Sequence, residues 1–543
     1  MSTTIVVFIP VSRSSVRSIR LPVVAISSLV VVFGLQAASA PTANSAAKKR
    51  GVASKATTTV ASTAPAKAMA KDPILRVALS FPPKAGLSVF SDDAFLLARL
   101  GATESLVKAN SAGATEPLLA TSWEQKAPTT WRFILRSGVK FHDGSPVDAA
   151  AVAKALNAVG SATTPPRAVR GIGLKASVVD ATTVEVTTTK PDPLVPLRLS
   201  SPGTAILASA AYASTPPSPI NSGTGPFRID SFTPGQRINL SRNDSYWGEK
   251  PKLGGVEARL ILDAQARTNA LRAGELDIAE GVPTSQIDAV RSTPGLDVAI
   301  FDLPRTTTLY LNTSKPPFNQ LNLRRAVDLA IDRKALASKL LDGAAAPGAG
   351  YFGPAVSWDP DVVVGAVDIT EARNLVAKAG LPEPIRLWTY PARAELPELA
   401  TSIQGMLDKA GLETKITVAE YDTLEPKVLS GDYDMFLLSR SYVVDVPDPG
   451  AFLVSDFSCA GGYNLNRFCS PTFDDIVKPL ATTSDRAART RIFTDAAKVL
   501  EQEIVGVPVL HDKARIGISN KVRGYVADPL EQRLVTPALS LAS

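Results

Sequence analysis

Three short apolar segments separated by helical patterns constrain the fold more than any other feature of this sequence. They are "IRLWTY" at 385–390, "TKITVA" at 414–419 and "YDMFLLS" at 433–439. The stretches between them have the apolar periodicity of amphipathic helices. Strands that alternate with helices through short loops predict a mostly parallel sheet covered by helices. Ligands of such α/β sheets bind beyond the carboxyl ends of the strands.

The stretch "SYVVDVPDPGAFL", Ser441 to Leu453, follows the third of these strands. It places two acids, Asp445 and Asp448, where a ligand crevice is expected.

Earlier segments predict β-hairpins and helices. A strand at 131–135 precedes a helix that starts near Asp148, and a hairpin turns at Asp180-Ala181. Two further strands flank Pro234-Gly235. After residue 309, a helical stripe is followed by Asp332, which we expect to cap a second helix that ends before Gly343.

The length of 543 residues exceeds what one hydrophobic core organises, so two or three domains are expected. The formal net charge of +7 is concentrated at the N-terminus, because residues 1–71 hold nine basic residues and no acid. The remainder has 49 basic and 51 acidic residues, so it is nearly neutral. We therefore expect no nucleic-acid partner.

The N-terminus has the pattern of an export signal. Three arginines precede an apolar run at 21–40 that ends in small residues, so 1–40 is a signal peptide or an uncleaved membrane anchor. Residues 41–71, rich in Ala, Thr and Lys, form a flexible linker. No cysteine follows the apolar run, so the protein is expected in a periplasm or at the outer face of the cytoplasmic membrane without a lipid anchor.

Several segments together resemble the solute-binding proteins of ABC peptide importers, a family of dipeptide-binding, oligopeptide-binding and nickel-binding proteins. They occur in family order from about residue 73 to about 525. The matching segments include "TTWRFILRSGVKFHDGSPVDAAAVAKAL", "GTGPFRIDSF", "LSRNDSYWGEKPKLGG", "LYLNTSKPPFNQLNLRRAVDLAIDRKAL", "GDYDMFLLS" and "DVPDPGAFL".

The resemblance implies an α/β, two-lobed periplasmic-binding-protein-like fold of class II, with hinged lobes and a β-rich subdomain inserted in the first lobe. Lobe I comprises 72–100, 220–308 and 512–543, the inserted subdomain 101–219, and lobe II 309–511. The chain would cross between lobes near Leu309–Asn312 and again near Val509. Two such lobes close on a ligand by hinge motion.

The resemblance also implies a ligand-binding carboxylate. In peptide-binding members, an aspartate in a loop of this kind pairs with the free α-amino group of the peptide, and Asp445 matches it. Asp448 belongs to the same candidate site, although we expect it mainly to shape the loop, and loop shaping is also the alternative for Asp445. Tyr442 stands where the family often has tryptophan.

Three further side chains complete the candidate ligand site. Trp388 and Tyr390 share one strand face and would line the cleft or, alternatively, pack in the core. Arg440 would meet a ligand carboxylate or form an inter-lobe ion pair.

Cys459 and Cys469 are disulfide candidates in an exported protein, with two free buried thiols as the alternative. His142 and His511 are the only histidines and have no partner at ligand spacing, so no metal site and no cofactor are expected.

These features predict a monomeric binding protein that delivers a peptide ligand to an ABC permease. The alternatives are a sensor or biosynthetic accessory that holds a small charged metabolite, and a binder of a chelated metal such as nickel. An enzyme is not expected, because the sequence has no G-x-S-x-G, H-E-x-x-H or phosphate-loop motif.

Overall fold

The computed structural model describes residues 72–110, 113–355, 363–379, 383–393, 395–443 and 445–542. The predicted signal or anchor at 1–40 and the linker at 41–71 lie outside these ranges. Within the described ranges, none of the helices combines the length and apolar character that a membrane crossing requires.

One large sheet runs through the described part of the chain. Its strands follow the order β15-β14-β16-β12-β17-β11-β1-β10-β9-β8, and β13 pairs with β17 off this path. The strands are β15 (Thr414–Val418), β14 (Ile385–Thr389), β16 (Met435–Ser441), β12 (Leu296–Leu311), β17 (Gly506–Ser519), β11 (Ile278–Glu280), β1 (Ile74–Leu79), β10 (Gly255–Leu260), β9 (Arg237–Arg242), β8 (Phe227–Thr233) and β13 (Ala345–Pro347).

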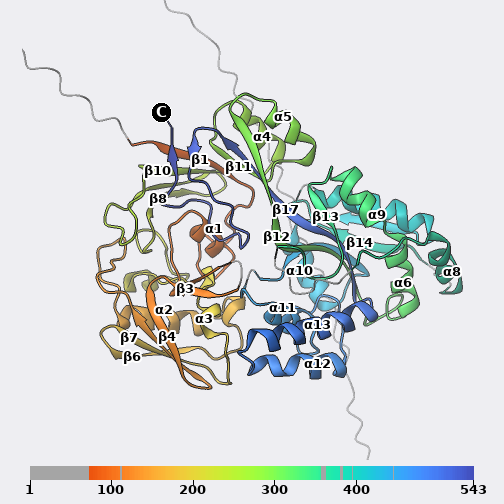
Figure 1. Ribbon diagram of the computed structural model, residues 1–543, viewed down its shortest axis with the longest axis horizontal. Coiled ribbons are helices and arrows are strands. Elements are labelled where there is room, and N and C mark those ends of the chain that lie inside the picture. The colour runs from red at the N-terminus through yellow and green to blue at the C-terminus, as the bar shows by residue number, and fades with distance from the viewer. Residues whose placement is uncertain are drawn as a thin grey trace, which may run out of the picture. The chain divides into compact units, whose positions relative to one another are not determined.

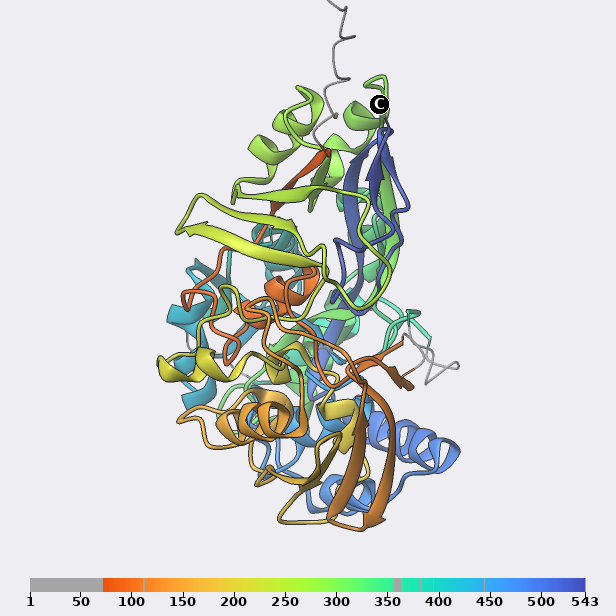
Figure 2. The same cartoon turned by 90° about the vertical axis from the view of Figure 1, so that its left-hand side faces the viewer.

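Two long strands, β12 and β17, join the two halves of this sheet. They pair antiparallel from Leu296–Ser519 to Tyr310–Gly506, and Figure 2 shows them side by side. The register shifts between Asp302 and Thr306. On one side of this shift β17 also pairs with β11, and on the other side β12 also pairs with β16. The two halves of the sheet therefore meet on β12 at 302–306, and the predicted lobe boundaries and crossings stay predictions.

The second half of the sheet contains the strands from which the α/β fold was predicted. Strand β14 pairs parallel with β15 and with β16, but β16 pairs antiparallel with β12. The prediction of a mostly parallel sheet, which was made from these three strands, is therefore confirmed for them. The prediction did not include β12 and β17, which pair antiparallel with each other. The helices α6 (Leu321–Ala330), α8 (Ile369–Ala379) and α9 (Glu395–Lys409) pack here (Figure 1).

The hairpins predicted before residue 245 are present. A separate four-stranded antiparallel sheet has the order β4 (Ala120–Ala127), β5 (Thr130–Leu135), β7 (Thr183–Thr187), β6 (Lys175–Asp180). Helix α2 (Ala149–Gly160) packs with it and starts where predicted, because the Asp148 side chain accepts a hydrogen bond from Ala151 N at 2.8 Å. β8 and β9 form the antiparallel pair around Pro234-Gly235.

The remaining elements connect or cover these sheets. In the first half they are α1 (Asp93–Arg99), β2 (Val107–Ala109), β3 (Thr115–Pro117), η1 (Arg167–Val169), α3 (Val195–Arg198), η2 (Pro202–Thr204), η3 (Ser209–Ala213), α4 (Ala264–Arg272), η4 (Thr284–Gln286) and α5 (Ile287–Arg291). In the second half they are α7 (Arg333–Ala335), η5 (Leu336–Leu340), α10 (Tyr421–Ser430), α11 (Pro449–Phe457), α12 (Pro471–Val477), η6 (Lys478–Ala481), α13 (Arg486–Gln502), β18 (Val522–Arg523) and β19 (Ser540–Leu541).

The helix cap predicted at Asp332 is also present. Its side chain accepts a hydrogen bond from Ala335 N at 2.9 Å, and Gly343 follows the helical segment with a φ of +71°. A positive φ of this kind favours glycine, which explains why the segment ends there.

The buried apolar side chains form several cores, some of which join parts of the chain that are distant in sequence. One core gathers side chains of 309–510, one those of 75–102, 205–278 and 516–541, and one those of 106–208. Val446, from the loop after β16, is buried in the third of these cores. The loop that carries Asp445 is therefore anchored in the subdomain as well as in its own half of the sheet.

The two faces of β5 give a test of this packing. Phe133 is fully buried in the subdomain core, whereas the neighbouring Ile134 is 46% exposed. We expect Phe133→Ala to lower the free energy of unfolding by about 3–5 kcal/mol through lost burial and a cavity. The control Ile134→Ala should change it by less than about 0.5 kcal/mol. Calorimetric unfolding checks both, and equal effects would contradict the assignment of the two faces.

Candidate functional site

Asp445 lies between two arginines that come from distant parts of the chain. It follows β16, and its Oδ1 accepts a hydrogen bond from Arg167 Nε at 2.9 Å. Its Oδ2 is 3.4 Å from both terminal nitrogens of Arg440. Arg167 belongs to the subdomain and Arg440 to β16, so this carboxylate links the subdomain to the second half of the large sheet.

Each arginine has a second acidic partner. Arg440 donates from Nε to Asp456 Oδ2 at 2.9 Å and from Nη2 to Asp456 Oδ1 at 3.1 Å, and its guanidinium lies 4.7 Å from the centre of the Tyr463 ring. Arg167 donates from Nη2 to Asp92 Oδ1 at 2.8 Å. The result is a chain of alternating charges, from Asp92 through Asp445 to Asp456.

The arginines determine the charge of Asp445. Burial alone would raise the pKa of its carboxyl, but the nearby guanidinium groups outweigh burial and hold this pKa below its ordinary value. Asp456 behaves differently, because complete burial raises its pKa although Arg440 opposes the shift. Asp445 is therefore ionised at neutral pH and can pair with a cation.

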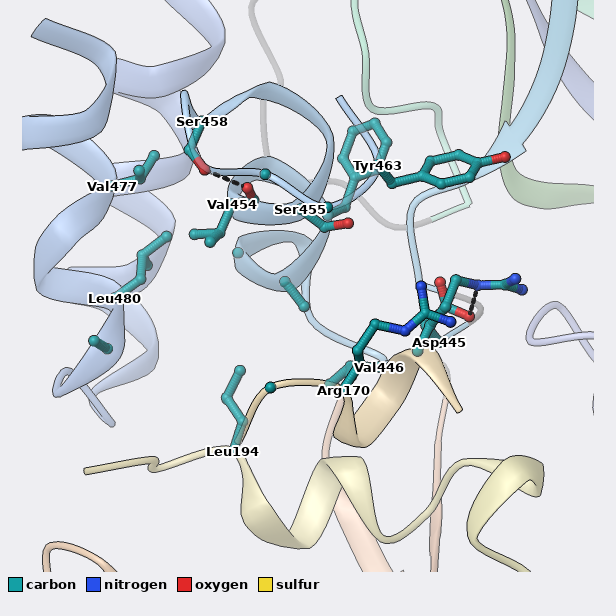
Figure 3. Close-up of a pocket in the computed structure, with 18 of the residues that line it drawn as sticks. Arg170, Leu194, Asp445, Val446, Val454, Ser455, Ser458, Tyr463, Val477 and Leu480 are labelled. Atoms are coloured by element: carbon teal, nitrogen blue, oxygen red, sulfur yellow. Dashed lines mark hydrogen bonds and ion pairs between the residues drawn. The ribbon is translucent and has the colours of Figure 1, made fainter. Parts of the chain in front are cut away.

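A cavity of about 850 Å³ lies beside Asp445 (Figure 3). One wall comes from α11, α12 and the loop around Tyr463, and the opposite wall from subdomain loops that carry Arg170 and Leu194. Much of the lining is apolar, including Val446, Val454, Val477 and Leu480. A second cavity of about 330 Å³ shares Arg167, Arg170 and Asp445 with the first. Volumes of this order accommodate small organic ligands.

Tyr442 and Asp448 lie near the cavity but have structural bonds. Tyr442 lines the larger cavity, and its hydroxyl donates to Gly353 O at 3.2 Å and accepts from Gly353 N at 3.1 Å. Asp448 accepts from Gly450 N at the start of α11 and pairs with Arg489 at 2.5 and 3.0 Å. This geometry supports the expected loop-shaping role of Asp448.

Trp388 and Tyr390 lie elsewhere. Both are buried in the core of the second half of the sheet, and neither lines the two described cavities. The ring of Tyr390 packs edge-on against Tyr421 at 5.3 Å, and Arg386 lies over the ring of Trp388. Their arrangement matches the core packing that was the alternative to a ligand contact.

Cys459 and Cys469 form a disulfide between α11 and α12. The bond closes the short loop that contributes Ala460, Gly461, Gly462 and Tyr463 to the larger cavity. It therefore restrains one wall of this cavity.

The contribution of Arg167 was not predicted from the sequence. It lies 278 residues before Asp445, in "TPPRAVRG" at 164–171, and has no motif around it. The only available signal was two arginines in a proline-containing loop of the inserted subdomain. Pairings of this kind depend on how distant elements pack.

A second polar cluster at the crossing was also missed. Asp512 accepts a hydrogen bond from Thr307 Oγ1 at 2.7 Å and another from Ser439 Oγ, and it lies 3.9 Å from Arg393. The Arg393 guanidinium stands over the ring of Phe81, at the end of β1, at 6.0 Å. The cluster ties β12, β16 and β17 together next to the first half of the sheet.

Neither histidine has the surroundings of a metal ligand. His142 Nε2 bonds with Gly225 O at 2.9 Å, and His511 Nε2 accepts from Ala349 N at 3.1 Å. Among the described residues, no group of three or more His, Cys, Asp or Glu side chains is arranged to hold a metal ion.

His511 should make stability depend on pH. Burial lowers the pKa of His511 from its ordinary value of 6.5 to about 4. The unfolded chain therefore binds a proton at a pH where the folded protein does not, and stability falls as the pH drops from 6.5 to 4. We expect His511→Gln to remove about 3 kcal/mol of the stability loss over this range. Chemical denaturation of both proteins at pH 7 and pH 4.5 measures it, and identical pH slopes would contradict it.

Comparisons with known proteins agree with this arrangement. The model of the bacterial extracellular solute-binding proteins, family 5 Middle, matches residues 114–464. The chain is 30% identical over 349 residues to probable di/tripeptide-binding protein 5 of Pseudomonas aeruginosa, across 61% of this chain and 66% of that protein. It is 27% identical over 430 residues to the probable D,D-dipeptide-binding periplasmic protein of Escherichia coli, across 77% and 83% of the two chains.

A solved structure has the same fold. The nickel-binding protein NikA of Staphylococcus aureus, crystallised with Ni(L-His)2, superposes with a TM-score of 0.77 at 24% identity, across 86% of this chain and 100% of that one. The predicted two-lobed α/β fold is confirmed by this likeness.

Proposed function

Because the chain belongs to the bacterial extracellular solute-binding proteins of family 5, we propose that it captures short peptides between its two lobes and delivers them to an ABC importer. The observation that carries the proposal is Asp445, an ionised carboxylate at the edge of a cavity lined by two separate parts of the chain. The peptide's α-ammonium group pairs with it.

The charge balance of the site favours an ammonium ligand. A charge enclosed with little water must be paired, because an unpaired one costs several kcal/mol. Asp445 already pairs with the guanidinium groups of Arg167 and Arg440. A ligand ammonium that displaces one of these arginines therefore leaves the charge around Asp445 unchanged. Arg167 is the arginine that can leave Asp445, because it keeps its ion pair with Asp92.

The remaining lining suits the body of a peptide. Apolar side chains such as Val454, Val477 and Leu480 accept peptide side chains without specific bonds. The cavity of about 850 Å³ has room for several residues. Relatives named as di/tripeptide-binding and D,D-dipeptide-binding proteins support the same ligand class.

A second candidate ligand is a metal held by an organic chelator. The observation that favours it is the positive charge of Arg170, Lys190 and Lys478, which line the larger cavity and form no ion pair among the described residues. Such cations bind the carboxylates of a chelate. Transport of such a complex would require no histidine or cysteine ligands from this chain.

The proposal includes a location and a partner. The protein works outside the cytoplasmic membrane, as a monomer that docks on a membrane permease. It performs no catalysis and releases its solute unchanged, in keeping with a family of solute-binding proteins.

Asp445→Asn tests the ammonium pairing. We expect the affinity for peptides with a free N-terminus to fall by about 2–4 kcal/mol, because a charged partner of a buried pair is lost. Asp474→Asn is the matched control, since Asp474 lines the same cavity and accepts from Cys459 N, a bond that asparagine preserves. Titration calorimetry measures both, and equal affinities of the wild type and Asp445→Asn would refute the role of Asp445.

Native mass spectrometry of the purified protein separates the two ligand classes. A retained guest with the mass of a short peptide is expected. A guest whose isotope pattern contains a transition metal would favour the chelate and contradict the peptide proposal.

A further inference from the structure

The carboxylate proposed to bind the ligand is occupied by a side chain of the protein itself. Arg167 donates to Asp445 at 2.9 Å from the subdomain, across the cavity from β16. Its Nη2 is at the same time bonded to Asp92 at 2.8 Å. One guanidinium therefore bridges Asp92, just before α1, and Asp445, in the loop after β16.

This ion pair lies at the junction of two cavities. The cavities of about 850 and 330 Å³ both include Arg167, Arg170 and Asp445 in their linings. Figure 3 shows Asp445 at the edge of the larger cavity. Separation of the pair would join the two spaces into one.

We propose that Arg167 is a gating side chain: it holds the place of the ligand's ammonium group on Asp445 in the unliganded protein, and it withdraws onto Asp92 when that group arrives. The proposal rests on the proposed function, because it assumes a ligand ammonium at Asp445. It assigns Arg167 two effects, which are to hold the lobes together without ligand and to exclude ligands that lack a positive charge.

The bonds of the two arginines explain why Arg167, and not Arg440, moves. Arg440 is bound at two points to Asp456, which is fully buried, and stacks on Tyr463; its own side chain is 11% exposed. Arg167 is 29% exposed and makes one hydrogen bond to Asp445. Its bond to Asp92, a largely exposed residue on its own side of the cavity, can persist as the lobes part.

The exchange leaves no buried charge without a partner. Asp445 receives the ligand's ammonium and keeps Arg440, while Arg167 keeps Asp92. A neutral ligand cannot do this, because removing Arg167 would leave Asp445 with Arg440 alone, which Asp456 also shares. The gate therefore selects for a free amino terminus in addition to any direct contact that the ligand makes.

The first experiment needs no ligand. Small-angle X-ray scattering of the unliganded protein should give a larger radius of gyration for Arg167→Ala than for the wild type, since the bond between the lobes is lost. Arg132→Ala is the matched control, because Arg132 lies in the same subdomain, pairs with Glu185 and lines neither of the two described cavities. Arg167→Lys, which keeps the positive charge, should restore the wild-type radius.

The second experiment measures binding by calorimetry, with trialanine and N-acetyl-trialanine as probes. Arg167→Ala should bind trialanine about tenfold more tightly than the wild type, because the internal competitor is removed. N-acetyl-trialanine should gain less than about twofold, and Arg132→Ala should match the wild type with both probes.

The possible results distinguish a failure of the gating proposal from a failure of the proposed peptide ligand. An unchanged radius for Arg167→Ala, or weaker trialanine binding by a correctly folded Arg167→Ala, would overturn the gate. Failure of all four proteins to bind trialanine would contradict the proposed function, and the scattering result would then decide the gate alone. An equal gain in affinity for both probes would show that Arg167 blocks the cavity regardless of the charge of the ligand. This result would also overturn the proposal.

Discussion

The ion pairs around Asp445 are the interaction on which the proposed site depends. A carboxylate enclosed between two parts of a protein must be neutralised, and here the neutralising groups come from both sides. The same requirement gives the site its selectivity, because any group that takes the place of Arg167 must be positive. It also explains why the loop after β16 is fixed so firmly, with Asp448 bound to Arg489 and Val446 buried in the subdomain.

The large sheet also connects the two halves of the molecule, through β12 and β17. β12 and β17 are paired along both halves of the sheet, and their register shifts at 302–306. These two strands are therefore the part of the sheet that both halves share. The cluster of Asp512, Thr307 and Ser439 lies next to this shift, so the crossing is held by polar bonds as well as by the strand ladder.

Local features were predictable from the sequence because local chemistry determines them. The cap at Asp148, the cap at Asp332 and the strand at 385–389 follow from residue types a few positions apart. The order of the matched segments indicated the family, which in turn indicated the two-lobed architecture. The antiparallel direction of β12 and β17 was not predicted, because strand direction within a sheet depends on connections hundreds of residues long.

The site was predictable only in part, for the same reason. Asp445 and Arg440 lie five residues apart and follow a recognisable loop pattern, and the structure brings both to the cavity. Trp388 and Tyr390 share a strand face as expected, but helices cover that face and both rings pack in the apolar core. Arg167 reaches Asp445 only through the packing of the subdomain against the second half of the sheet, and no local pattern encodes that contact.

A crystal structure of the protein with a bound peptide tests the central claim most directly. The account predicts the peptide's ammonium nitrogen within hydrogen-bond distance of Asp445, and Arg167 bonded to Asp92 alone. A peptide bound elsewhere, with Arg167 still on Asp445, would contradict it.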